Sequence, residues 1–549
     1  MARATATRSK SKTKAASATK TKRTSSGAGS AKRNGVAKAK SGGTTRRATK
    51  SSASVDGVTR TNGQAKTNGK ARTNGKSQTN GRSQTNSKAR TNGRSSSRKS
   101  TSLRTYRSVL NYLRTVSNYE SAPPVAYNKR TFKLDRMKKL LSALGHPEKE
   151  FKSVHVAGTK GKGCTSTMVA CMLQGCGYKV GLYTSPHLTT VRERMTIDGA
   201  MPTEQEFTKL LARVATEAIK ALGKDEDATY FELLTAAAFV WFAESEVDFA
   251  VIETGLGGRL DSTNIIKPEV CGITNISYDH MALLGPKLTD IAEEKAGIFK
   301  KGVPVVSAPQ EPEVMGVLKR AAEEMGSTFC VPGDDNEFSY RFEATRLLGP
   351  HTRLSLTTSR SRFEHLPVPL PGEHQAINCS VALSMLDALK TRGFKIDDQK
   401  AIEGLGNVKI RGRMEMVREE PRTLIDGAHN AASVEALMRA IGQTVPYDSM
   451  IVIFACQRDK DIAGMLRHVQ LGADKIIFTT ARTKRSADPH DLLQMFQESC
   501  TKMAQVAENL EDALSIAERA VSRDDLICIT GSFYIVGEAR KKFKEKIAV

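Results

Sequence analysis

The stretch GTKGKG, residues 158–163, is the strongest candidate for chemistry in this sequence. It lies between an apolar run at Ser153–Ala157 and a helical pattern that begins at Cys164. Glycines let a backbone approach an anion closely, and the free N–H groups at the start of a helix favour phosphate. Lys162 is placed to reach the terminal phosphates of a nucleotide. We therefore predict a phosphate-binding loop, against the alternative of an ordinary strand-to-helix turn with a surface lysine.

This stretch departs from the Walker pattern G-x-x-x-x-G-K-[ST] at two positions. Val156 stands where the first glycine belongs, and Gly163 takes the place of the hydroxyl residue. Thr165 or Ser166, at the start of the predicted helix, is expected to provide the missing hydroxyl.

Three later segments bring further polar groups to the ends of predicted strands. TSPHL offers Ser185 and His187, and ETGLGGRLDSTN begins with Glu253. NISYDH offers Asp279 and His280. In an open parallel sheet, ligands bind in the crevice outside the carboxyl ends of the strands, where these groups would complete Mg²⁺ coordination beside phosphate oxygens. Each residue also has an ordinary explanation, as a helix cap, an ion-pair partner or a turn histidine.

Apolar runs alternate with helical patterns along the chain, which predicts βαβ units and a mainly parallel sheet. Helices are expected over Leu103–Tyr119 and Phe132–Leu144. A glycine-rich basic stretch, Gly404–Met414, is interpreted as the junction to a second, smaller α/β domain. The predicted strands are Ser153–Ala157, Lys179–Thr184, Phe249–Thr254, Val270–Ile276 and Val303–Ser307 before the junction, and Thr423–Ile425, Met450–Ala455, Lys475–Thr480 and Leu526–Thr530 after it.

The charge of the 549-residue chain is unevenly distributed. The formal net charge is +26, yet residues 1–100 hold 26 Lys or Arg and a single acid, Asp56. The rest holds 58 bases and 57 acids, as expected of a near-neutral globular protein, and its length indicates two domains. Nine scattered cysteines without a C-x-x-C pair favour a reducing compartment over disulfides or a thiolate zinc site. The lack of an apolar run of about 18 residues, or of an apolar N-terminal segment, argues against a membrane span and a secretory signal.

The basic N-terminal hundred residues contain a hexapeptide, such as RTNGQA, repeated six times from Arg60 to Ser95. The repeat has no aliphatic residue beyond alanine to bury and repels itself, so we expect disorder. Three roles are open for this tail. It is a solvated extension, a salt-sensitive and non-specific binder of nucleic acid or another polyanion, or an organelle transit peptide.

Ten ordered motifs resemble the folylpolyglutamate synthase/dihydrofolate synthase family of Mur-type ligases. The motifs run from about Leu103 to the C-terminus and are HVAGTKGKG, TSPHL with RERMTIDG, ETGLGGRLDSTN, ITNISYDH, IAEEKAGIFK, PGEHQAINCSVAL, GRMEMV, DGAHN, DKD and TGSFYIVGE. The resemblance implies a Mur-ligase-like α/β fold, with a P-loop ATPase domain built on a mainly parallel sheet and a smaller Rossmann-like C-terminal domain. It also implies ATP-dependent addition of L-glutamate to a pterin or folate carboxylate through an acyl phosphate. We accordingly divide the chain into a disordered basic tail (1–100), an ATP-binding central domain (101–408) and a C-terminal glutamate-ligase domain (409–549).

The resemblance also implies roles for individual residues. The residues matching ATP contacts are Gly158, Thr159, Lys160, Gly161, Lys162, Gly163, Cys164, Thr165, Asn378, Arg413, Asp426 and His429. The residues matching ligands of two Mg²⁺ ions are Ser185, Glu253, His280 and Lys295, the last as a carbamylated lysine. The residues given a catalytic role are Lys162, Lys295 and His280. Arg413 is expected at the hinge between the two domains.

Several residues depart from the family pattern. Lys160 replaces the usual Asn of GTNGKG, which strengthens phosphate attraction, and Cys164 replaces a hydroxyl residue. Tyr278 stands where an aliphatic residue is usual, and Arg411 lies where a Trp-Pro-Gly-Arg pattern is common.

Three functions are considered. The favoured one is a folate ligase, whose expected substrate is dihydropteroate, a reduced folate or both. A Mur-type ligase acting on cell-wall precursors is less favoured, because such enzymes place Thr-Thr after GTNGK and this chain has Gly163. A nucleic-acid-binding protein on a degenerate ligase fold is disfavoured because the residues matching metal ligands are all present. We expect a cytoplasmic monomer acting on small molecules and not associated with a membrane.

Overall fold

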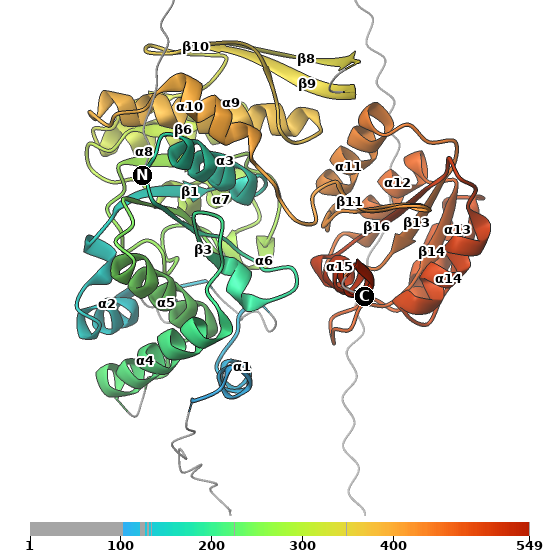
Figure 1. Ribbon diagram of the computed structural model, residues 1–549, viewed down its shortest axis with the longest axis horizontal. Coiled ribbons are helices and arrows are strands. Elements are labelled where there is room, and N and C mark those ends of the chain that lie inside the picture. Colours follow the sequence, from blue (N-terminus) through green and yellow to red (C-terminus); the bar gives the residue numbers. More distant parts are fainter. Residues whose placement is uncertain are drawn as a thin grey trace, which may run out of the picture. The chain divides into compact units, whose positions relative to one another are not determined.

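The computed structural model (Figure 1) describes residues 103–120, 127–128, 131–132, 134–223, 226–346 and 349–547. The predicted disorder and the proposed roles of residues 1–100 lie outside this part of the chain. Within it, no helix is long and apolar enough to cross a membrane.

A seven-stranded sheet organises the first half of the described chain, in the order β3-β2-β4-β1-β5-β6-β7. Every neighbouring pair is parallel except β2 and β3. The strands are β1 (Lys152–Ala157), β2 (Val180–Tyr183), β3 (Met195–Ile197), β4 (Phe249–Glu253), β5 (Val270–Ile273), β6 (Val305–Ser307) and β7 (Phe329–Cys330).

Helices cover both faces of this sheet, which explains why residues of its central strands β1 and β4 are buried on both faces and do not alternate between buried and exposed. Val154 and Val156 of β1 pack on the side of α3 and α9, whereas Ala250 and Ile252 of β4 pack on the side of α4 and α5. The helices of this half are α1 (Tyr106–Thr115), α2 (Leu134–Ala143), α3 (Lys162–Gly175), α4 (Glu204–Leu222), α5 (Tyr230–Glu244), α6 (Met281–Leu284), α7 (Leu288–Ala296), α8 (Pro312–Glu324), α9 (Glu373–Thr391) and α10 (Asp398–Gly406), with 3₁₀ turns η1 (Pro147–Lys149) and η2 (Val191–Arg194).

A small antiparallel sheet lies on the outer side of α9 (Figure 1). It consists of β8 (Glu337–Thr345), β9 (Gly349–Thr357) and β10 (Arg362–Pro367), in the order β10-β9-β8. Leu354, Leu356 and Phe363 join the same buried cluster as α9, so this sheet completes the core on that side.

The second half of the chain forms a six-stranded sheet in the order β11-β12-β16-β13-β14-β15, with only β11 antiparallel. Val452 and Phe454 of β13 face α11 and α12, whereas Ile451 and Ile453 face α14 and α15. The strands are β11 (Glu415–Glu419), β12 (Arg422–Ile425), β13 (Met450–Phe454), β14 (Lys475–Phe478), β15 (Met503–Val506) and β16 (Leu526–Thr530), and the helices are α11 (Ala431–Thr444), α12 (Ile462–Gly472), α13 (Pro489–Gln497), α14 (Leu510–Ala520) and α15 (Phe533–Ile547).

The α/β class with two mainly parallel sheets is confirmed, and each predicted strand coincides with a strand of the structure. The helix predicted over Leu103–Tyr119 is shorter, because α1 covers only Tyr106–Thr115. The stretch interpreted as the junction begins inside α10, where Gly404 packs against α3 so closely that a Cβ would lie 2.2 Å from the carbonyl oxygen of Cys171. The domain boundary at residue 409 stays a prediction.

A buried histidine, His155, lies in the middle of β1 directly below the glycine turn. Its Nε2 is 2.9 Å from Oγ1 of Thr263, which itself donates to Oδ1 of Asp261 at 2.5 Å. Because the Thr263 proton is used in that bond, the ring must donate from Nε2. Its buried Nδ1 has no partner, and burial lowers the pKa of His155 to about 3.

Replacing His155 with Gln is expected to make the free energy of unfolding depend less on pH below about pH 6.5. As the pH falls below about 6.5, His155 becomes protonated in the unfolded chain but stays neutral in the folded chain, whose pKa at this residue is about 3. The free energy of unfolding therefore falls. The wild-type loss attributable to His155 is about 2 kcal/mol between pH 6.5 and pH 5. Gln keeps the donor to Thr263 but does not titrate. Urea unfolding of the wild type and the variant at about pH 6.5 and pH 5 measures this loss. If the free energy of unfolding changes with pH equally in both proteins, His155 is not its source.

Candidate active site

The glycine turn links β1 to α3 and is shaped by two close contacts. Gly158 and Gly161 have φ values of 148° and 89°, and a Cβ on them would lie 1.8 Å from Thr274 Oγ1 and 2.1 Å from Asn378 Oδ1. The turn is fastened by the backbone N–H groups of Thr159 and Lys160, which donate to the carbonyl of Asn275. Since α3 begins at Lys162, its unpaired first-turn N–H groups lie at this turn and favour an anion.

The hydroxyl expected at the phosphate loop does not reach it. Thr165 and Ser166 are fully buried, and neither lines the cleft. Within the described residues their hydroxyl oxygens have no hydrogen-bond partner.

Cys164 and Thr167 of the same helix do line the cleft. Sγ of Cys164 lies 3.6 Å from Nε2 of Gln375, and the Thr167 hydroxyl donates to the carbonyl of Gly163 at 2.7 Å. Burial raises the pKa of the Cys164 thiol.

Lys162 faces a buried carboxylate across the cleft. Its Nζ lies 3.9 Å from Oε1 of Glu253, the last residue of β4, whose side chain is 4% exposed. The backbone N–H of Ser185 donates to the other oxygen of Glu253 at 3.1 Å. Burial raises the pKa of Glu253 to about 7, although Lys162 and Ser185 oppose the shift. The carboxylate is thus incompletely compensated and offers its charge to a further cation.

Lys295 of α7 approaches the glycine turn from the other side. Its buried Nζ donates to the carbonyl oxygen of Gly158 at 2.7 Å. Burial, reinforced by repulsion from Lys162, holds the pKa of Lys295 well below its usual value.

Asp279 joins two lysines from different parts of the chain. Lys160 of the glycine turn lies 2.8 Å from its Oδ2, and Lys460, between β13 and α12, lies 3.4 Å from its Oδ1. Burial alone would raise the pKa of Asp279, but these cations hold it well below the ordinary range. His280, the next residue, has a left-handed backbone with φ of 52° and a half-exposed ring.

The second half of the chain contributes Arg413, Asp426 and His429. The guanidinium of Arg413 lies 3.9 Å from Asp426 Oδ1 and 4.8 Å above the centre of the Phe533 ring. Asp426 accepts from the backbone N–H groups of Met414 and Ala428, and burial raises its pKa. The backbone N–H of His429 donates to Oγ of Ser433 at 3.0 Å, and Nδ1 of its ring lies 2.9 Å from the carbonyl oxygen of Gly427.

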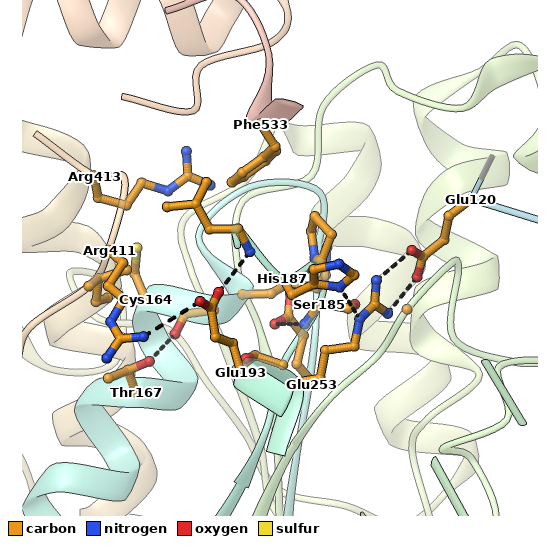
Figure 2. Close-up of a pocket in the computed structure, with 18 of the residues that line it drawn as sticks. Glu120, Cys164, Thr167, Ser185, His187, Glu193, Glu253, Arg411, Arg413 and Phe533 are labelled. Carbon is orange, nitrogen blue, oxygen red and sulfur yellow. Dashed lines mark hydrogen bonds and ion pairs between the residues drawn. The ribbon is translucent and has the colours of Figure 1, made fainter. Parts of the chain in front are cut away.

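These side chains share one cleft of about 1490 Å³, lined by both halves of the chain within one compact unit (Figure 2). The sequence-predicted residues that line it are Gly158, Thr159, Lys160, Gly161, Lys162, Gly163, Cys164, Ser185, Glu253, His280, Lys295, Arg413 and His429. Thr165, Asn378 and Asp426 lie behind this surface, where Asn378 packs under Gly161 and Asp426 under Arg413.

Other residues of the cleft were not assigned a role from the sequence. Three aromatic side chains, Tyr119, Phe132 and Phe231, line the cleft and are called the aromatic wall below. Lys460 and Glu120 are two further charged residues of the lining. These residues contact partners far away in the sequence, so no local sequence pattern indicates that they lie in the cleft. Lys460 is a partial exception, because it belongs to the DKD motif quoted above.

Family models match both halves of the chain. The Mur ligase middle domain matches residues 156–386, and the Mur ligase glutamate ligase domain matches residues 412–533. The dihydrofolate synthase/folylpolyglutamate synthase of Bacillus subtilis is 35% identical over 415 residues, which cover 75% of this chain and 95% of that relative. The chain belongs to the folylpolyglutamate synthase/dihydrofolate synthase family. It is accordingly an ATP-dependent ligase that forms an amide bond.

Further relatives of this ligase agree in sequence and in structure. Dihydrofolate synthetase of Saccharomyces cerevisiae is 30% identical, with 74% of this chain and 96% of the relative covered. Mycobacterium tuberculosis folylpolyglutamate synthase complexed with ADP and AMPPCP gives a TM-score of 0.70 at 31% identity, covering 75% of this chain and 95% of that one. The E. coli FolC complex with DHPP and ADP gives 0.68 at 27% identity, covering 81% and 98%.

The loop that carries Ser185 is held against the second half of the ligase by a close backbone contact. Gly537 of α15 lies so near Leu188 that a Cβ would be 2.2 Å from its carbonyl oxygen. Glu193 holds the same loop by accepting from the N–H groups of Leu188 and Thr189, and Arg411 lies 3.5 Å from that carboxylate.

A Gly537→Ala substitution is expected to lower ligase turnover by about tenfold or more, because the added methyl group displaces α15 from the Ser185 loop. Stability should not fall in parallel, since alanine favours the helix by about 1 kcal/mol. Gly442→Ala in α11 is the matched control, because no atom lies within 4 Å of its added Cβ. The test measures turnover and thermal unfolding of both variants. Equal turnover in the two would show that the contact between Gly537 and Leu188 is not needed for catalysis.

Proposed function

We propose that this ligase adds L-glutamate to the carboxylate of a pterin or folate, with cleavage of ATP and an acyl phosphate intermediate. The observation that carries the proposal is the meeting of Lys162, Glu253 and Arg413 in one cleft, at the start of a helix suited to phosphate. The relatives described above carry folate-ligase names, which supports the choice of substrate.

The nucleotide's phosphates are proposed to lie on the glycine turn, with Lys162 neutralising the charge that develops on the transferred phosphoryl group. Residues 158–164 supply the turn and the first helical N–H groups. Asn378 packs against Gly161, and Arg413, paired with Asp426, contacts the nucleotide from the second half of the chain together with His429. The substrate carboxylate attacks the γ-phosphorus and releases ADP. The amine of glutamate then attacks the acyl carbon and releases phosphate.

The proposed metal is Mg²⁺, and the residues fit a site shared with the nucleotide. Within the described residues, no group of three or more His, Cys, Asp or Glu is placed to hold a metal by itself. The buried, incompletely compensated carboxylate of Glu253 and the hydroxyl of Ser185 offer the oxygen ligands that Mg²⁺ prefers, and phosphate oxygens would provide others. His280 completes the proposed set, with Lys295 as a carbamate. When bound, the metal would neutralise phosphate charge during transfer.

The aromatic wall is proposed to receive the flat ring of the substrate. Tyr119 and Phe132 pack with their ring centres 5.2 Å apart, and Phe231 lines the same cleft. A conjugated bicyclic ring stacks on such side chains, while its carboxylate points toward Lys162. Dihydropteroate and tetrahydrofolate both satisfy this arrangement.

We further propose a cytoplasmic monomer, and all nine cysteines being free thiols supports a reducing compartment. The basic residues 1–100 remain a candidate for non-specific polyanion binding on the strength of their charge alone.

The reaction is tested by ADP release from purified protein with MgATP and L-glutamate, with and without dihydropteroate or tetrahydrofolate. We expect release that requires glutamate and at least one pterin. Lys162→Ala should reduce it by about 100-fold or more, because the phosphoryl charge is left without its cation. Lys138→Ala, on the exposed side of α2, is the control and should not change the rate. Absence of pterin-dependent release from folded wild-type protein would contradict the folate assignment and favour cell-wall precursors.

Carbamylation of Lys295 is tested by adding ¹³C-bicarbonate and recording the carbamate resonance by NMR. A buried, neutral amine reacts with CO₂, so the wild-type protein should give one protected resonance. Lys295→Arg should lose that resonance and most of the activity, whereas Lys287→Arg, at the exposed start of the same helix, should keep both. A resonance that persists in Lys295→Arg would assign the carbamate to another lysine.

A further inference from the structure

His187, in the loop after β2, has one ring nitrogen committed to a buried arginine. Nε of Arg194 donates to Nδ1 of His187 at 2.9 Å. A guanidinium has donors only, so Nδ1 must accept, and the ring proton of the neutral imidazole must lie on Nε2. The contact therefore fixes the tautomer of His187.

Arg194 cannot turn away from this contact without breaking a buried network. Its side chain is 1% exposed, and its two terminal nitrogens donate to the two carboxylate oxygens of Glu120 at 2.7 and 2.5 Å. The guanidinium also lies 5.4 Å from the centre of the Tyr230 ring. Figure 2 shows the dashed lines running from Glu120 through the guanidinium to His187. The bidentate pair thus holds the arginine in a fixed plane.

The other ring nitrogen of His187 is left for a ligand. In the described part of the chain no group accepts a hydrogen bond from Nε2, and the ring lines the cleft. On one side, His187 lies two residues beyond Ser185, whose N–H is bonded to Glu253. On the other side, Arg194 links it to Glu120, the residue that follows Tyr119 of the aromatic wall. These contacts place His187 between Glu253 and the chain segment that carries Tyr119.

We propose that His187 is a substrate-contacting residue that donates from Nε2 to the carboxylate being activated. The inference rests on the proposed function, since the carboxylate must lie between the aromatic wall and the phosphoryl group. A donor of fixed direction binds one carboxylate oxygen and leaves the other aimed at the γ-phosphorus, which is an orientation effect on the reacting pair. Arg194 and Glu120 act through His187 as positioning residues.

Two substitutions separate this role from a structural one. His187→Asn keeps an acceptor oxygen where Nδ1 was, and so keeps the partner of Arg194, but it removes the donor to the cleft. His187→Gln places an amide N–H near the former Nε2 but leaves Arg194 without its acceptor. His187→Asn therefore loses only the hydrogen bond to the substrate, and His187→Gln loses only the hydrogen bond from Arg194.

The experiment measures kcat and KM for the pterin substrate and for ATP, together with thermal unfolding. We expect His187→Asn to lower kcat/KM for the pterin by about 10- to 100-fold, as for loss of one hydrogen bond to a charged group, while KM for ATP and the unfolding temperature stay close to wild type. His187→Gln should show a smaller loss of kcat/KM and a larger fall in unfolding temperature. The effect of His187→Asn should appear with each of dihydropteroate and tetrahydrofolate that the wild-type protein turns over, because both present a carboxylate.

The opposite pattern, with His187→Gln the less active variant, would overturn the proposal and leave His187 as a support for Arg194. Where the wild-type protein turns over both substrates, a loss in His187→Asn confined to one of them would also overturn it, by placing the contact on a part of the substrate other than the carboxylate. Wild-type protein without pterin-dependent turnover would instead refute the proposed function, so the two failures are distinguishable.

Discussion

A carboxylate without full compensation lies at the centre of this protein. Glu253 ends a buried strand, faces Lys162 at 3.9 Å and receives one backbone N–H from Ser185. Removing a charge from water is unfavourable unless other charges or hydrogen bonds replace the solvent, and here they do so only in part. The surrounding elements hold this arrangement. Lys162 begins α3 just after β1, Glu253 ends β4, and the N–H belongs to Ser185 in the segment after β2. A ligand that brings phosphate and a cation together supplies the charges that the site lacks.

The parallel sheets were predictable because their strands are short apolar runs separated by helical patterns, and the buried strands of such sheets are apolar on both faces. The β8–β10 sheet was not, since no residue of β8 is buried and the strand therefore lacks the apolar run on which the other strand predictions rest. The start of the second half was also obscured, because Gly404, the first glycine of the stretch, permits the close crossing of α10 and α3 and is not part of a flexible linker. A glycine-rich stretch has the same appearance in either role.

The candidate site divides in a similar way. The glycine turn, Ser185, Glu253 and His280 follow strand ends, and strand ends of one parallel sheet meet at one edge, so the sequence brings them together. Thr165 was expected to replace the loop hydroxyl, but α3 begins at Lys162, and that start directs position 164 to the cleft and position 165 into the core. The pairing of Lys160 with Asp279 and of Arg194 with Glu120 depends on tertiary contacts over 119 and 74 residues, which no local pattern reports.

Cys164 gives the nucleotide end of the cleft an unusual chemical property. Oxidants and alkylating agents attack the thiolate and not the thiol, and the raised pKa of this buried side chain keeps its proton in place at neutral pH. A sulfur atom at the first turn of α3 therefore adds volume and polarisability to the cleft, and as a protonated thiol it is a poorer nucleophile than an exposed thiolate in the same position would be.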